Sequence, residues 1–252
     1  MNTHFFIIPG NPGIVGYYDD FANKLRALGY KVSVLSYGNF SDDSEKFLSI
    51  NEEVSHKKDQ IISLIESCDR NILIGHSIGA WISLRLIDEI QFTKCIMIFP
   101  FIKKDISIKQ FAINFLLHYR GSISSLYDSI RRSNYGKLFL TYAANSLSMS
   151  YNSNSITRDY FLNKNVVRNC LNLAKSEFDT LEYFFDIEKL LKFKDKLIFY
   201  YCENDIWAPI SDYKFLSNIG FTCELLDECA HDFCVRKDDV EIVSKKLIED
   251  LK

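Results

Sequence analysis

The sequence predicts an α/β fold in which helices cover both faces of a mostly parallel central sheet. Short apolar runs alternate with stretches of helical periodicity, as expected of βαβ units. The 252 residues are enough for one domain with an insertion. Apolar residues make up 47% of the chain and charged residues 25%, which is typical of a globular protein rather than a disordered one.

Six short apolar segments have the composition of parallel strands that are buried on both faces. We predict strands over residues 4–9, 31–36, 71–74, 94–99, 196–202 and 222–226. Apolar residues at spacings of three and four predict helices between and after these strands. The predicted helices span residues 18–28, which Gly29 ends, 51–67, 78–90 and 238–251.

Residues 101–190 interrupt this alternation. They contain helix-like segments but no convincing strand, so we predict a helical cap inserted into a single α/β domain that spans residues 1–252. Within the cap, the Asn- and Ser-rich stretch 145–155 is interpreted as a mobile loop. The apolar segment from Ile108 to Tyr119 is a candidate lid face, acyl-chain pocket or lipid-contacting surface, with ordinary core packing as the alternative.

Charge and cysteine content narrow the classes of partner. The net charge is −3 and no long run of basic residues is present, so we expect no nucleic-acid partner. The seven cysteines lack framework spacing, and the three that flank His231 match no zinc pattern, so neither a metal nor another cofactor is expected. Without a secretory signal or an apolar run of about 20 residues, we expect a cytoplasmic protein with at most peripheral membrane contact.

The strongest chemical signal is the sequence Gly75-His76-Ser77-Ile78-Gly79. It matches the G-x-S-x-G nucleophile elbow and lies between a predicted strand and a predicted helix, which is the context that this motif requires. A serine on so sharp a turn adopts a strained backbone, and the two glycines avoid collisions with the neighbouring strand and helix. The motif therefore predicts an α/β-hydrolase fold with Ser77 as its nucleophile.

Two backbone N–H groups are expected to bind the oxyanion of a tetrahedral intermediate. The first belongs to Ile78, at the start of a helix whose N-terminus favours negative charge. The second belongs to the turn Pro9-Gly10-Asn11-Pro12-Gly13, which follows the first predicted strand. Here we assign Asn11, with Gly10 as the fallback because Pro12 has no amide hydrogen. An ordinary turn is the alternative interpretation of this loop.

Ser77 needs a base to remove its proton and a carboxylate to orient that base. The chain order of this fold is serine, acid, histidine, and His231 follows the last predicted strand, where the order puts the base. The other histidines lie in the first strand, in a helix, in the cap and beside the serine, where strand geometry points the ring away from the serine hydroxyl: His4, His56, His118 and His76.

Asp205 is the expected acid, because it lies in the turn that follows the predicted strand 196–202. Glu203 and Asp105 are its rivals. Asp105 follows the preceding strand, where some hydrolases keep the acid. A helix or turn cap is the alternative role for Asp205.

These residues belong to four blocks in which the chain resembles the lipid droplet-associated hydrolase family. The blocks are Ile8 to Gly13 with Tyr17, Tyr18 and Phe21 following, Gly75 to Ala80, Phe199 to Tyr201 leading to Asp205-Ile206-Trp207-Ala208-Pro209, and Ala230 to Cys234. The first block and the Asp-x-Trp-x-Pro block are more specific than the elbow, which many hydrolases share. The resemblance spans the core and covers little of the cap.

The resemblance implies an α/β hydrolase with Ser77, Asp205 and His231 as its catalytic triad. It also implies an association with neutral-lipid storage, with the lipid droplet surface as a location, and cleavage of esters such as sterol esters. We therefore expect a serine hydrolase that cleaves lipid or other carboxylic esters through an acyl-enzyme. A thioesterase, or a catalytically silent scaffold that binds lipid or a protein, is the alternative.

Overall fold

A six-stranded sheet forms the centre of the computed structural model, which describes residues 2–38, 47–65, 69–146, 149–161 and 164–251. The strand order is β2-β1-β3-β4-β5-β6, and every neighbouring pair runs parallel. All six predicted strands are confirmed with small shifts in their ends. They are β1 (Thr3–Ile8), β2 (Lys31–Val34), β3 (Arg70–His76), β4 (Lys94–Ile98), β5 (Leu197–Tyr201) and β6 (Thr222–Leu225).

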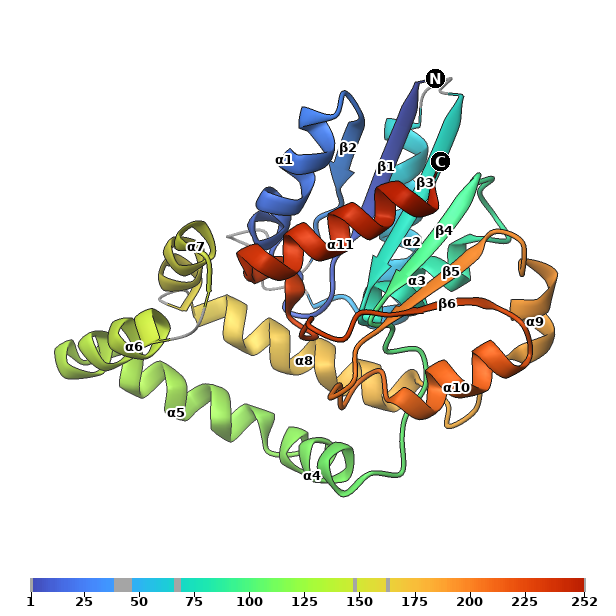
Figure 1. Ribbon diagram of the computed structural model, residues 1–252. Helices are drawn as coiled ribbons and strands as arrows, with labels where there is room; N and C mark the ends of the chain where they lie inside the picture. The colour runs from blue at the N-terminus through green and yellow to red at the C-terminus, as the bar shows by residue number, and fades with distance from the viewer. Residues whose placement is uncertain (1, 39–46, 66–68, 147–148, 162–163, 252) are drawn as a thin grey trace.

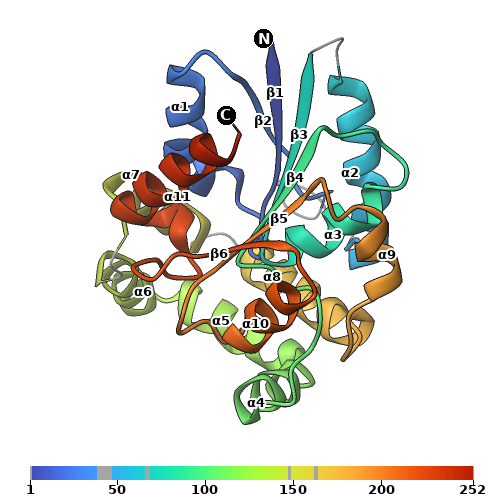
Figure 2. The same cartoon turned by 45° about the vertical axis from the view of Figure 1, so that its right-hand side comes forward.

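Helices cover both faces of the sheet, as the alternating pattern predicts (Figures 1 and 2). One face carries α1 (Asp19–Ala27) and α11 (Lys237–Asp250), which contact each other. The opposite face carries α2 (Ile50–Leu64) and α3 (Ile78–Leu86). Gly29 follows α1 with a φ of 86°, a left-handed conformation that glycine adopts without steric cost, so the predicted end of this helix is confirmed.

The connection between β4 and β5 is helical, and its described residues contain no strand. Figure 1 shows α8 crossing the sheet at the carboxyl ends of its strands, with α4 to α6 further from the sheet. A hydrogen bond joins α8 to α2, because the N–H of Ile50, the first residue of α2, donates to Ser176 Oγ of α8 at 2.9 Å. The helices are α4 (Ile108–Leu117), α5 (Arg120–Arg132), α6 (Asn134–Ser146), α7 (Tyr151–Phe161), α8 (Lys164–Thr180) and α9 (Ile187–Lys192), and α10 (Ile210–Asn218) follows β5.

The predicted mobile loop at 145–155 is wrong over most of its described residues. α6 runs to Ser146 and α7 begins at Tyr151, while residues 147 and 148 lie outside the described chain. Ser150 caps α7, because its hydroxyl accepts a 3.3 Å hydrogen bond from the Ser153 N–H. The Ser150 N–H in turn donates to the Val235 carbonyl at 2.7 Å. A tertiary contact and a local cap thus override the low helix propensity of Asn and Ser.

Strand register brings the functional loops to one edge of the sheet. Ile8 pairs with Gly75 and His76 pairs with Ile98, so the loops after β1, β3 and β4 begin side by side. In a parallel sheet the loops that leave the carboxyl ends of the strands lie on the same edge, where open α/β sheets bind ligands. The loops after β5 and β6 leave the sheet at this edge as well.

Candidate active site

Ser77 occupies a strained turn between β3 and α3. Its φ of 53° and ψ of −123° are rare for a residue with a side chain, and neighbouring backbone holds it there. The Ser77 N–H donates to Ile98 O at 3.0 Å, and the Phe101 N–H donates to Ser77 O at 3.1 Å. A Cβ at Gly75 would lie 2.5 Å from Ser83 Oγ, and one at Gly79 would lie 2.6 Å from Pro9 O. The turn therefore requires glycine at both positions.

A chain of hydrogen bonds joins Ser77, His231 and Asp205. His231 Nε2 lies 2.9 Å from Ser77 Oγ, and His231 Nδ1 lies 2.5 Å from Asp205 Oδ2. The Asp205 side chain is fully buried, whereas 23% of the His231 side chain is exposed. The structure therefore brings together three side chains from the loops after β3, β5 and β6, which are separated by up to 154 positions in the sequence.

Backbone donors fix the charge and orientation of Asp205. Its Oδ1 accepts hydrogen bonds from the Trp207 N–H at 2.7 Å and the Ala208 N–H at 3.2 Å. Burial acts to raise the pKa of Asp205, but hydrogen bonds from His231 and from these two amides outweigh burial and lower it. Asp205 therefore stays ionised and holds the hydrogen on His231 Nδ1, which leaves Nε2 free to accept the Ser77 proton.

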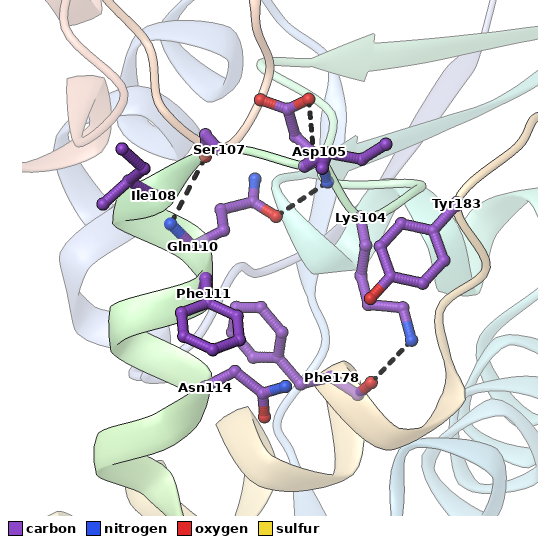
Figure 3. Close-up of a pocket in the computed structure, with 10 residues that line it drawn as sticks. Lys104, Asp105, Ser107, Ile108, Gln110, Phe111, Asn114, Phe178 and Tyr183 are labelled. Carbon is purple, nitrogen blue, oxygen red and sulfur yellow. Dashed lines mark hydrogen bonds between the residues drawn. The ribbon is translucent and has the colours of Figure 1, made fainter.

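The two rival acids lie elsewhere. Glu203 is exposed in the turn after β5. Asp105 precedes α4 and lines the pocket shown in Figure 3, where its carboxylate accepts the Ile106 N–H at 2.8 Å. This pocket also includes side chains of α4 and α8, but Ser77 and His231 are not among its lining residues. Of the three carboxylates, Asp205 is the one hydrogen-bonded to His231 Nδ1.

The loop after β1 lies against Ser77. A Cβ at Gly10 would lie 2.9 Å from Ser77 Cβ, so the loop that contains the predicted donor Asn11 lies beside the serine, and the predicted donor Ile78 follows Ser77 in the chain. The Gly10 N–H donates a 2.8 Å hydrogen bond to the Tyr18 hydroxyl, so the fallback donor is already engaged. Ile78 is the first residue of α3, and its N–H has no carbonyl four residues earlier within the helix.

The side chain of Asn11 connects this loop to α8. No sequence pattern predicted this connection. Asn11 Nδ2 donates to the Cys170 carbonyl at 3.1 Å and to Glu177 Oε1 at 3.0 Å. Burial raises the pKa of Glu177 to about 8, although the hydrogen bond from Asn11 opposes the increase. No local pattern indicates this contact, because it joins residues 166 positions apart.

His76 is the second residue whose contacts the sequence analysis did not anticipate. Its two ring nitrogens contact the Tyr18 hydroxyl and the backbone carbonyl of His231, whereas the nitrogen that contacts the Ser77 hydroxyl belongs to His231. Burial, followed by the nearby His231, lowers the pKa of His76 to about 3. In the described part of the chain, no cluster of three or more His, Cys, Asp or Glu side chains is arranged to hold a metal ion.

Two apolar cavities adjoin the Gly10–Asn11 loop. The first has a volume of about 240 Å³ and is bordered by Gly10, Asn11 and His231. The second, also about 240 Å³, lies between the same loop and helices α7 and α8, and Val167 and Leu171 line it. The two share four lining residues, so they are adjacent: Pro12, Ile14, Tyr17 and Thr157.

Large apolar side chains are exposed on α4, α5 and α6. This apolar face comprises Ile108, Phe111, Phe115, Leu116, Tyr119, Ile123, Leu126, Tyr135, Leu138, Phe139 and Tyr142. Phe111 is 73% exposed, and α5 has no buried residue. None of the described helices is both long and apolar enough to cross a membrane.

The sequence of the chain matches a known family. Residues 1–234 match the family model of lipid-droplet associated hydrolase. A lipid droplet-associated hydrolase from Gallus gallus is 24% identical over 243 residues, which cover 83% of this chain and 72% of the relative. One from Drosophila melanogaster is 34% identical over 116 residues, or 38% of each chain.

Solved structures share the fold at low sequence identity. An esterase from Exiguobacterium antarcticum aligns over 98% of this chain and 91% of its own, with a TM-score of 0.65 and 13% identity. A bromoperoxidase from Bacillus anthracis aligns over 100% and 92%, with a TM-score of 0.68 and 13% identity. The predicted fold class is therefore confirmed: this chain has the α/β-hydrolase fold and belongs to the lipid-droplet associated hydrolase family.

Proposed function

We propose that this protein is a serine esterase that cleaves carboxylic esters of lipids through an acyl-enzyme. The observation that carries the proposal is the hydrogen-bond chain from Ser77 Oγ through His231 to Asp205, with distances of 2.9 Å and 2.5 Å. A serine hydroxyl becomes an effective nucleophile when a histidine oriented by a carboxylate accepts its proton. Membership in a hydrolase family supports the same reaction class.

In the acylation step, Ser77 Oγ attacks the ester carbonyl carbon and its proton moves to His231 Nε2. The carbonyl oxygen becomes an oxyanion, which accepts hydrogen bonds from the backbone N–H groups of Ile78 and Asn11. When the intermediate collapses, the bond to the alcohol oxygen breaks and the alcohol takes the proton from His231. Asp205 stabilises the imidazolium while that proton is held.

Deacylation repeats these proton transfers with water as the nucleophile. Water gives a proton to His231 Nε2 as its oxygen attacks the acyl carbon, and the oxyanion forms at the same two N–H groups. The bond to Ser77 Oγ then breaks, and Ser77 takes the proton back as the carboxylic acid leaves. The cycle needs no group beyond these residues and water.

An apolar substrate is supported by the two adjacent cavities. The first borders the Gly10–Asn11 loop and His231, although Ser77 itself is not among its lining residues, and the second continues from it to aliphatic side chains of α8. Apolar cavities beside the proposed base suit the apolar portion of a substrate. Burial of such a chain is favourable at about 25 cal/mol per Å² of apolar surface. We therefore assign an acyl or sterol portion of the substrate to these cavities.

Association with a lipid surface is supported by the apolar face of α4 to α6. Exposed apolar patches of this kind on soluble domains mark interaction sites, and amphipathic helices bind lipid by burying their apolar side chains at the interface. The relatives from Gallus gallus and Drosophila melanogaster are named for lipid droplets. We propose that this face rests on the droplet surface.

The test of the nucleophile is labelling with a fluorophosphonate probe, followed by mass spectrometry of the adduct. We expect the adduct on Ser77, and we expect both Ser77→Ala and His231→Ala to abolish it. His118→Ala is the matched control, because His118 is exposed at the end of α4 and should leave labelling unchanged. A folded wild-type protein that takes no label would contradict the esterase mechanism and favour a lipid-binding scaffold.

A further inference from the structure

A buried hydrogen-bond chain joins the loop after β1 to the loop after β6. The Gly10 N–H donates to Tyr18 Oη at 2.8 Å, Tyr18 Oη lies 2.5 Å from His76 Nδ1, and His76 Nε2 lies 2.8 Å from the His231 carbonyl oxygen. Tyr18 and His76 are only 2% and 5% exposed. The chain therefore connects the backbone beside Ser77 to the backbone of the residue that contacts the Ser77 hydroxyl.

The hydrogen-bond partners of His76 and Tyr18 determine which atoms of these two side chains carry a hydrogen. The His231 carbonyl can only accept, so His76 Nε2 must carry a hydrogen. In a neutral imidazole the other nitrogen is then an acceptor, so the Tyr18 hydroxyl donates to His76 Nδ1. The Tyr18 oxygen accepts the Gly10 N–H in return. One arrangement, with neutral His76, satisfies every buried donor and acceptor in the chain.

The surroundings of His76 favour this neutral form. The rings of Phe99 and Phe233 meet its ring edge to face, with centroids 6.5 Å and 5.0 Å away. The titratable groups that face it are Tyr18 and His231, with Asp205 and Asp232 acting at longer range. A buried imidazolium between apolar rings would lose its hydration without gaining a directly bonded carboxylate.

We propose that Tyr18 and His76 form a positioning relay that sets the distance between the oxyanion loop and the His231 loop. The inference rests on the proposed esterase function. Because the relay occupies the Gly10 N–H, it leaves oxyanion binding to Asn11 and Ile78. Because His76 Nε2 is hydrogen-bonded to the main-chain carbonyl of His231, while His231 Nε2 contacts the Ser77 hydroxyl, it limits movement of a loop that follows the edge strand β6.

Such a relay matters because catalysis is sensitive to small displacements. A shift of about 1 Å in a reacting group can lower the rate about 100-fold. His231 also becomes positively charged in each half of the cycle, and the His76 ring centroid lies only 5.2 Å from that of His231. A neutral His76 holds the base without repelling its charged form.

Nuclear magnetic resonance of protein labelled with ¹⁵N-histidine tests the proton positions directly. We expect His76 to show a protonated Nε2 and an unprotonated Nδ1, and to remain so between about pH 5 and pH 9, where ordinary histidines titrate. A proton on Nδ1, or a titration of His76 in this range, would overturn the relay. This readout does not depend on enzymatic activity, so it holds even if the esterase mechanism fails.

Kinetics on the intact protein test the positioning role. We expect Tyr18→Phe and His76→Leu to lower kcat about 10- to 100-fold on a soluble ester with little change in KM, because the chemistry and not substrate binding is disturbed. His76→Gln, which can still donate to the His231 carbonyl, should recover part of the lost kcat. This partial rescue would not follow from a purely space-filling role.

Tyr200→Phe is the matched control. Its hydroxyl is also buried and donates a 2.7 Å hydrogen bond, but to Asp250 of α11 and outside the relay. We expect it to change thermal stability and leave kcat unchanged. An active enzyme in which Tyr18→Phe behaves like Tyr200→Phe would refute the relay alone, whereas a wild-type protein without turnover would refute the proposed function.

Discussion

The loops at the carboxyl edge of the sheet and the apolar face of α4 to α6 differ in which side chains they expose to solvent. At the sheet edge, polar groups such as Asp205 and His76 are buried and each is hydrogen-bonded. On α4 to α6, large apolar side chains such as Phe111 and Phe139 face outward. Burial of the polar groups carries a desolvation cost that their hydrogen bonds offset, whereas exposure of the apolar side chains carries a cost that burial against a partner surface would offset.

The two regions therefore differ in what their interactions depend on. The sheet edge depends on distances between individual atoms, which hydrogen bonds to the backbone of the loops after β1, β3, β4, β5 and β6 maintain. The apolar face depends on exposed area, and no single side chain is decisive. Substitutions of the triad should therefore abolish or greatly lower turnover, whereas substitutions on the apolar face should weaken lipid binding additively and leave turnover of a soluble ester unchanged.

The largest effect is expected for Asp205→Asn. Loss of the carboxylate favours the wrong tautomer of His231, and in a serine protease the equivalent change lowers kcat about 10⁴-fold. We expect a fall of about 10³- to 10⁴-fold here, measured with a soluble chromogenic ester. Asp105→Asn is the control and should retain activity, since the Asp105 carboxylate accepts the Ile106 N–H and lies outside the site. The reverse result would make Asp105 the acid.

The apolar face is tested by the double substitution Phe115→Ser and Leu116→Ser. We expect at least about tenfold weaker flotation with phospholipid-coated triacylglycerol droplets, because burial of each such side chain contributes about 1.5–3 kcal/mol. Turnover of a soluble ester should not change. Equal flotation of wild type and variant would show that this face does not contact the droplet.

Leu28→Ser with Ile62→Ser provides the matched control for the apolar face. These side chains are 59% and 53% exposed, compared with 55% and 56% for Phe115 and Leu116, but they lie at the ends of α1 and α2. Their substitution removes apolar side chains of similar exposed fraction that lie outside the apolar face of α4 to α6. We expect flotation to be unchanged.

Narrowing the cavity beside α8 should have a smaller and selective effect. Val167→Trp places a large ring in the cavity of about 240 Å³, so we expect turnover of long-chain esters to fall several-fold relative to an acetate ester. The ratio of kcat/KM values across a series of acyl lengths measures this change. An equal loss for all chain lengths would argue that the substrate chain lies elsewhere.

The smallest effect concerns the pH dependence of stability, at the contact between α8 and the loop after β1. The folded-state pKa of Glu177 is raised from 4.5 to about 8, so its contribution to stability is complete below pH 4.5 and is lost as the pH rises through 8. Glu177→Gln should therefore flatten the fall in the free energy of unfolding across this window, measured by urea denaturation. Glu188→Gln, on the exposed surface of α9, should retain the wild-type pH dependence.

Much of the fold could be predicted because its signals are local. Each strand is a short apolar run, and the elbow needs only five consecutive residues between a strand and a helix. The exception is the stretch 145–155, where the interpretation relied on composition alone. Its helical part is stabilised by the Ser150 cap and by the contact of Ser150 with Val235, which lies 85 positions away.

Local sequence patterns are enough to predict the strands, the elbow at Ser77 and the candidates for base, acid and oxyanion donors. Three contacts became known only from the folded chain: Asp205 and not Asp105 contacts His231, Tyr18 accepts the Gly10 N–H, and Glu177 accepts a hydrogen bond from Asn11. The physical reason is that strand and turn preferences act between neighbouring residues. The partners in these three contacts lie 8 to 166 positions apart and meet only when the sheet brings its loops to one edge.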